Sequence, residues 1–271
     1  MASPRETLQP DLASPLNWGG MLPQLENTHL YQMHEMHHAA MAPVGMLANA
    51  GKHIYHNPLN PLSYTTFGRT LAAASELVER ITRRYGKPEF GLTETAIGKR
   101  KVAVQEETVE VLPFCNLLHF SRDTTREDPR LLIVAPMSGH HATLLRGTVQ
   151  DLLPHADVYI TDWIDARDVP LYEGKFDLDD YIYYVMSFLK KLGPNTHVMA
   201  VCQPAVPVFA AAALMNAQRD RCAPKSMTLI GGPIDTRINS TEVNKLAETR
   251  PLSWFEQNVV TRVPVNYPGF T

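Results

Sequence analysis

The chain has 271 residues and a net charge of −3; 44% of its residues are hydrophobic and 20% are charged. This composition is typical of a globular protein with one large domain or two small ones. The charge lacks the basic excess of nucleic-acid-binding proteins, so no nucleic acid is expected as a partner. Three cysteines cannot build a disulfide framework, which indicates a reducing compartment. No apolar run reaches the length of about 18 residues that a membrane span needs. Met1–Asn17 lacks the pattern of a secretory signal, so we expect a cytoplasmic protein.

The N-terminal third is predicted to be mainly helical. Residues 1–24 contain four prolines and two adjacent glycines and are expected to form a loose tail. The apolar spacing predicts a helix from Thr28 to about Ala50. Two Asn-Pro turns within Asn57–Tyr64 end this helix, and a second one is expected from about Thr70 to Tyr85.

The rest of the chain is predicted to alternate strands and helices. The first two strands are expected to be antiparallel, and the short apolar runs after them are typical of strands buried on both faces. Helical patterns separate these runs, which predicts an α/β fold with a mostly parallel sheet. The expected strands are 102–110, 114–121, 131–135, 157–161, 197–201 and 227–230, and the expected helices are 141–153, 178–192, 204–217 and 241–258.

One cysteine stands at the sharpest junction of a strand and a helix. In Met199–Pro207 (MAVCQPAVP) a buried strand ends, Cys202 follows, and an alanine-rich helix begins at once. This layout resembles the nucleophile elbow G-x-S-x-G, with Cys in place of Ser and with Ala200 and Pro204 in place of the glycines. The positive end of the helix would stabilise negative charge on the sulfur. A buried structural cysteine beside a helix start would give the same pattern.

An oxyanion hole would need backbone donors from two loops. The N–H of Gln203 would supply one donor. The loop after the third predicted strand, 131–135, would supply the other through Met137 or Ser138. Gly139 gives that loop conformational freedom. His140 and its neighbour His141 could contact substrate, although surface histidines at a helix start are the simpler interpretation.

Several segments together resemble the intracellular polyhydroxyalkanoate (polyhydroxybutyrate) depolymerases. They run from residue 30 to the last residues of the chain, and as a set they are specific to that family. The segments are LYQMHE (30–35), NPLNPLSY (57–64), APMSGHHATLLRGTV (135–149), TDWIDARDVP (161–170), VCQPAVPVFAAAALM (201–215), GGPIDTR (231–237), WFEQNV (254–259) and VPVNYPG (263–269).

The resemblance implies an α/β-hydrolase fold in which Cys202 is the nucleophile. It further implies hydrolysis of the ester bonds of stored polyester, giving 3-hydroxyacid monomers or oligomers, with no cofactor and no metal. The polyhydroxyalkanoate granule would be the partner, and the protein would be cytoplasmic or bound to granules. In this interpretation the chain divides into an N-terminal tail and helical extension (1–95), a partial hydrolase core (96–240) and the start of a cap region (241–271).

The resemblance also raises an expectation about the end of the chain. In α/β-hydrolases the triad follows the order nucleophile, acid, histidine, whereas all eleven histidines of this sequence lie at or before His197. We therefore expect a C-terminally truncated member of the family with an incomplete sheet, and a chain that is weakly active or inactive by itself. Loss of a triad member leaves roughly 10³–10⁴-fold catalysis over water in other enzymes.

Two other functions remain open at this point. A polyhydroxyalkanoate synthase-like acyltransferase also uses a cysteine on this fold, but synthases resemble G-x-C-x-G, and Ala200 and Pro204 argue against that pattern. A non-catalytic protein that binds the granule through an apolar surface is the third hypothesis.

Other candidate site residues have competing interpretations. His34–His38 (HEMHH) matches the zinc motif H-E-x-x-H, but no third ligand follows, and a solvated face of a helix is preferred. Asp162 could serve as an alternative acid, although a helix cap or an ion pair is favoured. Trp163 could bind polymer or pack beneath the sheet.

Overall fold

The computed structural model describes residues 22–137, 141–261 and 263, and for 22–30 only the course of the backbone. Two compact units divide the chain: 1–83 with 247–264, and 84–246 with 265–271. The sequence predicts domain boundaries at 95/96 and 240/241, and these stay a prediction. The expected loose tail over 1–24 lies almost wholly outside the described residues.

The first unit is built on two long helices. Helix α1 (Leu22–His56) continues through Pro43 and is longer at both ends than the sequence predicts, and α2 (Thr66–Thr82) follows the short helix η2 (Pro61–Tyr64). The side chain of Thr65 caps α2 by accepting a hydrogen bond from the N–H of Gly68. The short helix α7 (Leu252–Asn258) also belongs to this unit. No helix in the described part of the chain is both long and apolar enough to cross a membrane.

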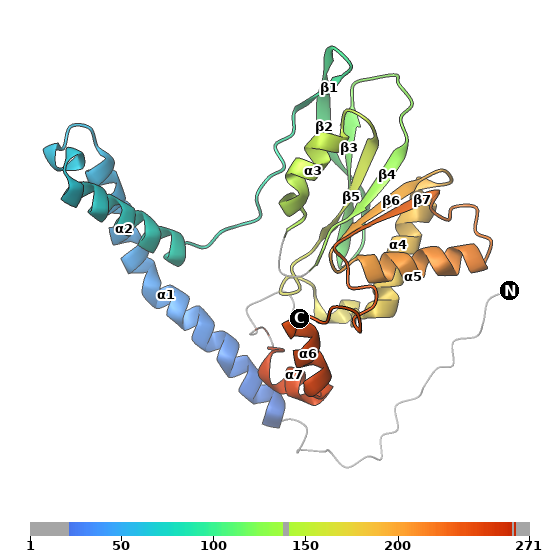
Figure 1. Ribbon diagram of the computed structural model, residues 1–271. Helices are drawn as coiled ribbons and strands as arrows, with labels where there is room; N and C mark the ends of the chain where they lie inside the picture. Colours follow the sequence, from blue (N-terminus) through green and yellow to red (C-terminus); the bar gives the residue numbers. More distant parts are fainter. Residues whose placement is uncertain (1–21, 138–140, 262, 264–271) are drawn as a thin grey trace. The chain divides into compact units, whose positions relative to one another are not determined.

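The second unit contains a seven-stranded sheet in the order β1-β2-β3-β5-β4-β6-β7 (Figure 1). β1, β2 and β3 form antiparallel pairs, and β3 is also antiparallel to β5. β4 is parallel to both β5 and β6, and β6 is parallel to β7. The strands are β1 (Glu94–Ile97), β2 (Arg100–Val111), β3 (Cys115–Arg122), β4 (Arg130–Val134), β5 (Asp157–Trp163), β6 (His197–Val201) and β7 (Ser226–Ile230).

Helices connect the parallel strands and cover both faces of the sheet. α3 (Arg146–Leu152), preceded by η3 (Ala142–Leu145), lies on one face, and α4 (Leu178–Leu192) and α5 (Ala205–Ala217) lie on the other (Figure 1). Five of the seven strands run in one direction, because only β1 and β3 are opposed to the rest. The predicted α/β class, with a mostly parallel sheet and N-terminal helices, is confirmed.

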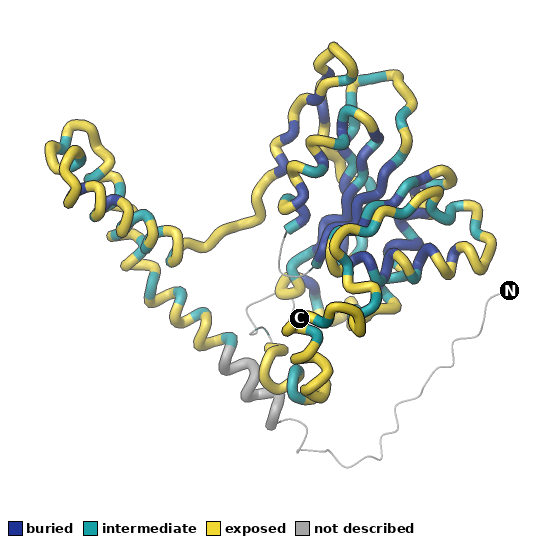
Figure 2. Tube along the Cα trace, in the orientation of Figure 1, coloured by how far each residue is buried: buried dark blue, intermediate teal, exposed yellow. Residues whose placement is uncertain are grey.

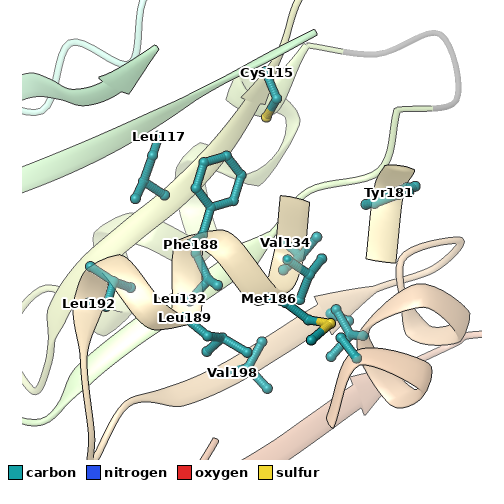
Figure 3. Close-up of a cluster of buried hydrophobic side chains, with 14 of the residues drawn as sticks. Cys115, Leu117, Leu132, Val134, Tyr181, Met186, Phe188, Leu189, Leu192 and Val198 are labelled. Carbon is teal, nitrogen blue, oxygen red and sulfur yellow. The ribbon is translucent and has the colours of Figure 1, made fainter. Parts of the chain in front are cut away.

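Each face of the sheet has its own hydrophobic core. Because side chains alternate along a strand, Leu132 and Val134 of β4 join the cluster under α4 and α5, whereas Leu131 and Ile133 join the cluster under α3. The buried residues concentrate on the strands and their covering helices (Figure 2). Figure 3 shows the α4 side, where Phe188 and other apolar side chains of α4 lie against the sheet.

The structure differs from the predicted elements in places that short-range patterns do not determine. Strand β1 has no counterpart among the predictions; its four residues pair with the start of β2. The single helix predicted over 241–258 is two helices, α6 (Glu242–Thr249) and α7, because Pro251 cannot continue a helix. By contrast, β6 and α4 have the predicted bounds.

The strand order places a topological switch point at the carboxyl end of β4. From β4 the chain crosses by α3 to β5 on one side, and from β5 it crosses by α4 to β6 on the other side. The loops that leave β4 and β6 therefore lead to opposite faces of the sheet. Such a switch point is where α/β sheets bind ligands.

The described core makes a test of stability possible. Leu132 is fully buried in the α4 cluster, so Leu132→Ala is expected to lower the free energy of unfolding by about 2–5 kcal/mol. The control is Leu178→Ala, since Leu178 is 54% exposed at the start of α4. Denaturant titration of both variants measures the difference, and equal losses would contradict the assigned core.

Candidate active site

Cys202 occupies the corner between β6 and α5. It is the residue directly after the last residue of β6, it is exposed, and its φ is +68°. A residue other than glycine in this left-handed region carries a strain of about 1–3 kcal/mol, which persists only where the surroundings enforce it. A strained residue between strand and helix, exposed at the carboxyl end of the sheet, has the backbone geometry of the α/β-hydrolase elbow.

The neighbouring strand and helix enforce this strain. The Cys202 N–H donates to the carbonyl oxygen of Ile230 at 2.7 Å, and the Cys202 carbonyl accepts from the Ala205 N–H at 3.1 Å. A Cβ atom on Gly232 would lie 2.0 Å from Ala205 Cβ and 2.9 Å from the Cys202 carbonyl oxygen. The loop after β7 therefore presses against the corner and leaves room only for glycine at that position.

The start of α5 faces the same corner. Its N-cap residue, Pro204, makes no side-chain capping hydrogen bond, so the helix relies on no side chain to satisfy its first N–H groups. The positive end of the helix dipole therefore lies next to Cys202 and stabilises negative charge there.

The two loops expected to supply oxyanion donors meet in the structure. The backbone N–H of Met137 donates to Oε1 of the Gln203 side chain at 3.4 Å. Within the described residues, the backbone N–H of Gln203 has no hydrogen-bond partner. The loop after β4 and the residue after Cys202 are thus in contact, and the Gln203 side chain occupies the Met137 N–H. Ser138, Gly139 and His140, which the sequence also suggested, lie outside the described residues.

Trp163 is held in the sheet. It ends β5, is only 7% exposed, and its Nε1–H donates to the carbonyl oxygen of Ala135 at 2.8 Å. Its predicted contact with substrate stays a prediction. The neighbouring Asp162 is buried and forms an ion pair with Lys87, in line with the ion-pair interpretation. On the loop beyond, the Arg167 side chain bonds Asp165 and holds the pKa of that carboxyl below its usual value.

The other two cysteines differ from Cys202 in environment. Cys115 is fully buried, and burial raises the pKa of its thiol well above the usual value. Its thiol therefore stays protonated and unreactive near neutral pH. Cys222 is partly buried in the turn before β7. Cys202 is the exposed cysteine of the three.

The ion pair of His119 and Asp157 lies away from this corner. His119 Nε2 lies 2.7 Å from Oδ1 of Asp157, but Asp157 begins β5, so the pair is at the edge of the sheet opposite Cys202. In α1, the rings of His34 and His38 are 4.6 Å apart. The described part of the chain holds no group of three or more metal-ligating side chains.

Residues far along the chain also hold this part of the backbone, and no sequence pattern predicted their contacts. Gly232 lies against Ala205 and the Cys202 carbonyl. The backbone of Ala135 is bonded by the side chains of Thr161 and Tyr181. A signal existed only for Gly232, because the pair Gly231-Gly232 directly follows a strand and suggests a close approach of two backbones.

The C-terminal part of the chain matches a model of a known protein family. Residues 231–271 match the family model described as "PHB de-polymerase C-terminus". Over these residues the resemblance to the polyhydroxybutyrate depolymerase family is confirmed. The matched segment starts at Gly231, beside the glycine that presses on the Cys202 corner. No curated protein sequence matches the chain.

The solved structures that are similar to this one include the following two. A "predicted CIB-like hydrolase" from Thermoplasma acidophilum is 13% identical, with a TM-score of 0.32, and the match covers 48% of this chain and 64% of that one. The Francisella virulence factor BioJ is 12% identical, with a TM-score of 0.38, and the match covers 79% of this chain and 69% of that one. This chain spans less than two thirds of the length of the first. Both TM-scores are below 0.5.

The strain at Cys202 can be measured by removing its Cβ. Cys202→Gly is expected to be more stable than Cys202→Ala by about 1 kcal/mol, because glycine adopts a positive φ without steric cost. At Cys222, whose φ is not positive, the order should reverse by about 0.5–1 kcal/mol. Thermal or denaturant unfolding of the four variants gives both differences. An alanine variant at 202 that equals the glycine variant would show that the corner is unstrained.

Proposed function

We propose that this chain hydrolyses ester bonds of polyhydroxyalkanoate, with poly-3-hydroxybutyrate as the representative substrate, and that Cys202 is its nucleophile. The observation that supports the proposal most is the strained, exposed Cys202 at the end of β6, next to a residue whose side chain bonds the Met137 N–H of the loop after β4. The depolymerase segment at 231–271 supports a polyester as the substrate class. The granule in the cytoplasm is the proposed place of action.

The proposed reaction has two halves. In acylation, the Cys202 thiol loses its proton and the sulfur attacks the ester carbonyl carbon, which gives a tetrahedral oxyanion. The N–H groups of Met137 and Gln203 hold that oxyanion. The alcohol end of the polymer leaves with a proton, and a thioester remains on Cys202. In deacylation, water attacks the thioester and releases the hydroxyacid.

The two halves are expected to differ in rate in these 271 residues. No histidine follows Cys202 in the sequence, so the base that would activate water in the usual order of the triad is not among them. Acylation needs only the thiolate and the oxyanion donors, whereas deacylation needs a base as well. We therefore expect an acyl-enzyme that accumulates and turns over slowly.

The test uses a p-nitrophenyl ester of 3-hydroxybutyrate. The chain is expected to release a burst of about one p-nitrophenolate per molecule, followed by a slow phase. Intact-mass and peptide analysis should place the acyl group on Cys202. Cys202→Ala should abolish the burst, and the control Cys222→Ala should keep it, because Cys222 lies in a turn away from the elbow.

Several outcomes would overturn the proposal. Acylation of Cys222 in place of Cys202, or a burst that survives Cys202→Ala, would remove Cys202 from its role. Acyl transfer from a thioester donor to hydroxyl acceptors, with growth of polymer, would favour the synthase-like acyltransferase. Co-sedimentation with polymer granules that is unchanged by Cys202→Ala, without any acylation, would favour a binding protein.

A further inference from the structure

A single residue, Ala135, is anchored on both its N–H and its C=O where β4 ends. The parallel pairing of β4 with β5 stops at Ile133, which is opposite Ile160. Beyond that point the N–H of Ala135 donates to the side-chain Oγ1 of Thr161, at 2.9 Å. A side chain of β5 thus replaces the next bond of the ladder, and this allows the chain to leave the sheet at Ala135.

The carbonyl of the same residue is also held by side chains. Trp163 of β5 donates to it from Nε1 at 2.8 Å, and Tyr181 of α4 donates from its hydroxyl at 3.4 Å. Burial raises the pKa of the Tyr181 phenol, so its hydroxyl keeps the proton that it donates. The backbone N–H and C=O of Ala135 are therefore both fixed by side chains from elements packed against it.

This anchor is shielded from water. Ala135 and Thr161 are fully buried, Tyr181 is 4% exposed and Trp163 is 7% exposed. Water cannot replace a lost partner there, so a missing side-chain group would leave a buried backbone group unpaired. The Trp163 ring is itself held edge-on by Tyr181, with 4.5 Å between the ring centroids.

Met137 follows only two residues after the anchor. The peptide with the Ala135 carbonyl and the peptide with the Met137 N–H are joined at Pro136, whose ring fixes φ, so only ψ of Pro136 is free between them. We infer that Thr161, Trp163 and Tyr181 are positioning residues, which aim the Met137 N–H at the oxyanion that forms on a substrate attacked by Cys202. This inference rests on the proposed function, because the three residues would hold the backbone that carries one donor of its oxyanion hole.

The experiment compares two reactions of the same sulfur. Acylation of Cys202 by a p-nitrophenyl ester passes through an oxyanion, whereas alkylation by iodoacetamide is a displacement at a saturated carbon and forms none. Both reactions depend on the accessibility of the sulfur and on its thiolate fraction. The ratio of the acylation rate to the alkylation rate therefore isolates the oxyanion hole from other effects on Cys202.

The main variant is Thr161→Val, which keeps the shape of the side chain and removes its oxygen. The ratio is expected to fall about 10- to 100-fold, because a misdirected donor loses most of its effect on the transition state. Trp163→Phe should act in the same direction. Tyr181→Phe should have the smallest effect, since Trp163 still satisfies the carbonyl of Ala135.

The matched control is Thr196→Val. Thr196 is also fully buried, and its hydroxyl donates to the carbonyl of Gly193 at 2.8 Å, but it precedes β6 at the edge of the sheet opposite Cys202. This variant should lose stability as Thr161→Val does and keep the ratio of the wild type. If Thr161→Val does not fold, Trp163→Phe and Tyr181→Phe are compared instead. The inference then predicts a lower ratio of acylation to alkylation for Trp163→Phe than for Tyr181→Phe.

The outcomes separate this inference from the proposed function. A folded Thr161→Val or Trp163→Phe variant with the wild-type ratio would overturn the positioning role while Cys202 remained the nucleophile. An equal fall of the ratio in Thr196→Val would show a general loss of stability and would also overturn it. A wild-type chain that reacts with iodoacetamide at Cys202 and is never acylated there would instead overturn the proposed function.

Discussion

The close approach of the loop after β7 to the start of α5 is the constraint on which the site depends. Gly232 allows this approach, because any larger residue would collide with Ala205 and with the backbone of Cys202. The hydrogen bond from Cys202 to Ile230 fixes the same corner from the side of β7. Together these contacts hold Cys202, whose side chain is exposed, in a backbone conformation that it would not adopt by itself.

The topology of the sheet brings the second half of the site to this corner. β4 and β6 are neighbours, and their connections leave to opposite faces, so the loops that follow them meet at the carboxyl edge. The Met137 N–H reaches the residue after Cys202 for this reason. In the proposed mechanism, the substrate carbonyl lies between two fixed parts of the chain. One is the loop that follows the buried Ala135, and the other is the strained corner at Cys202.

The sequence predicted those parts that depend on local pattern. The bounds of β6 and α4 follow from an apolar run and from an acidic N-cap ahead of an amphipathic stretch, and the corner at Cys202 follows from its place between strand and helix. The anchor of Ala135 could not be predicted, because Thr161 and Tyr181 are 26 and 46 residues away and carry no distinguishing motif. Strand β1 escaped prediction for a related reason, since four residues that depend on pairing with β2 carry little pattern of their own.

The most direct test of this account is a crystal structure of the chain acylated on Cys202 by a slowly hydrolysed hydroxyacyl ester. The account predicts that the thioester oxygen accepts hydrogen bonds from the backbone N–H groups of both Met137 and Gln203, and that the Gln203 side chain has moved off Met137. A positive φ at Cys202 should persist in that structure. A thioester oxygen directed to solvent, or a Cys202 with an ordinary negative φ, would contradict the account.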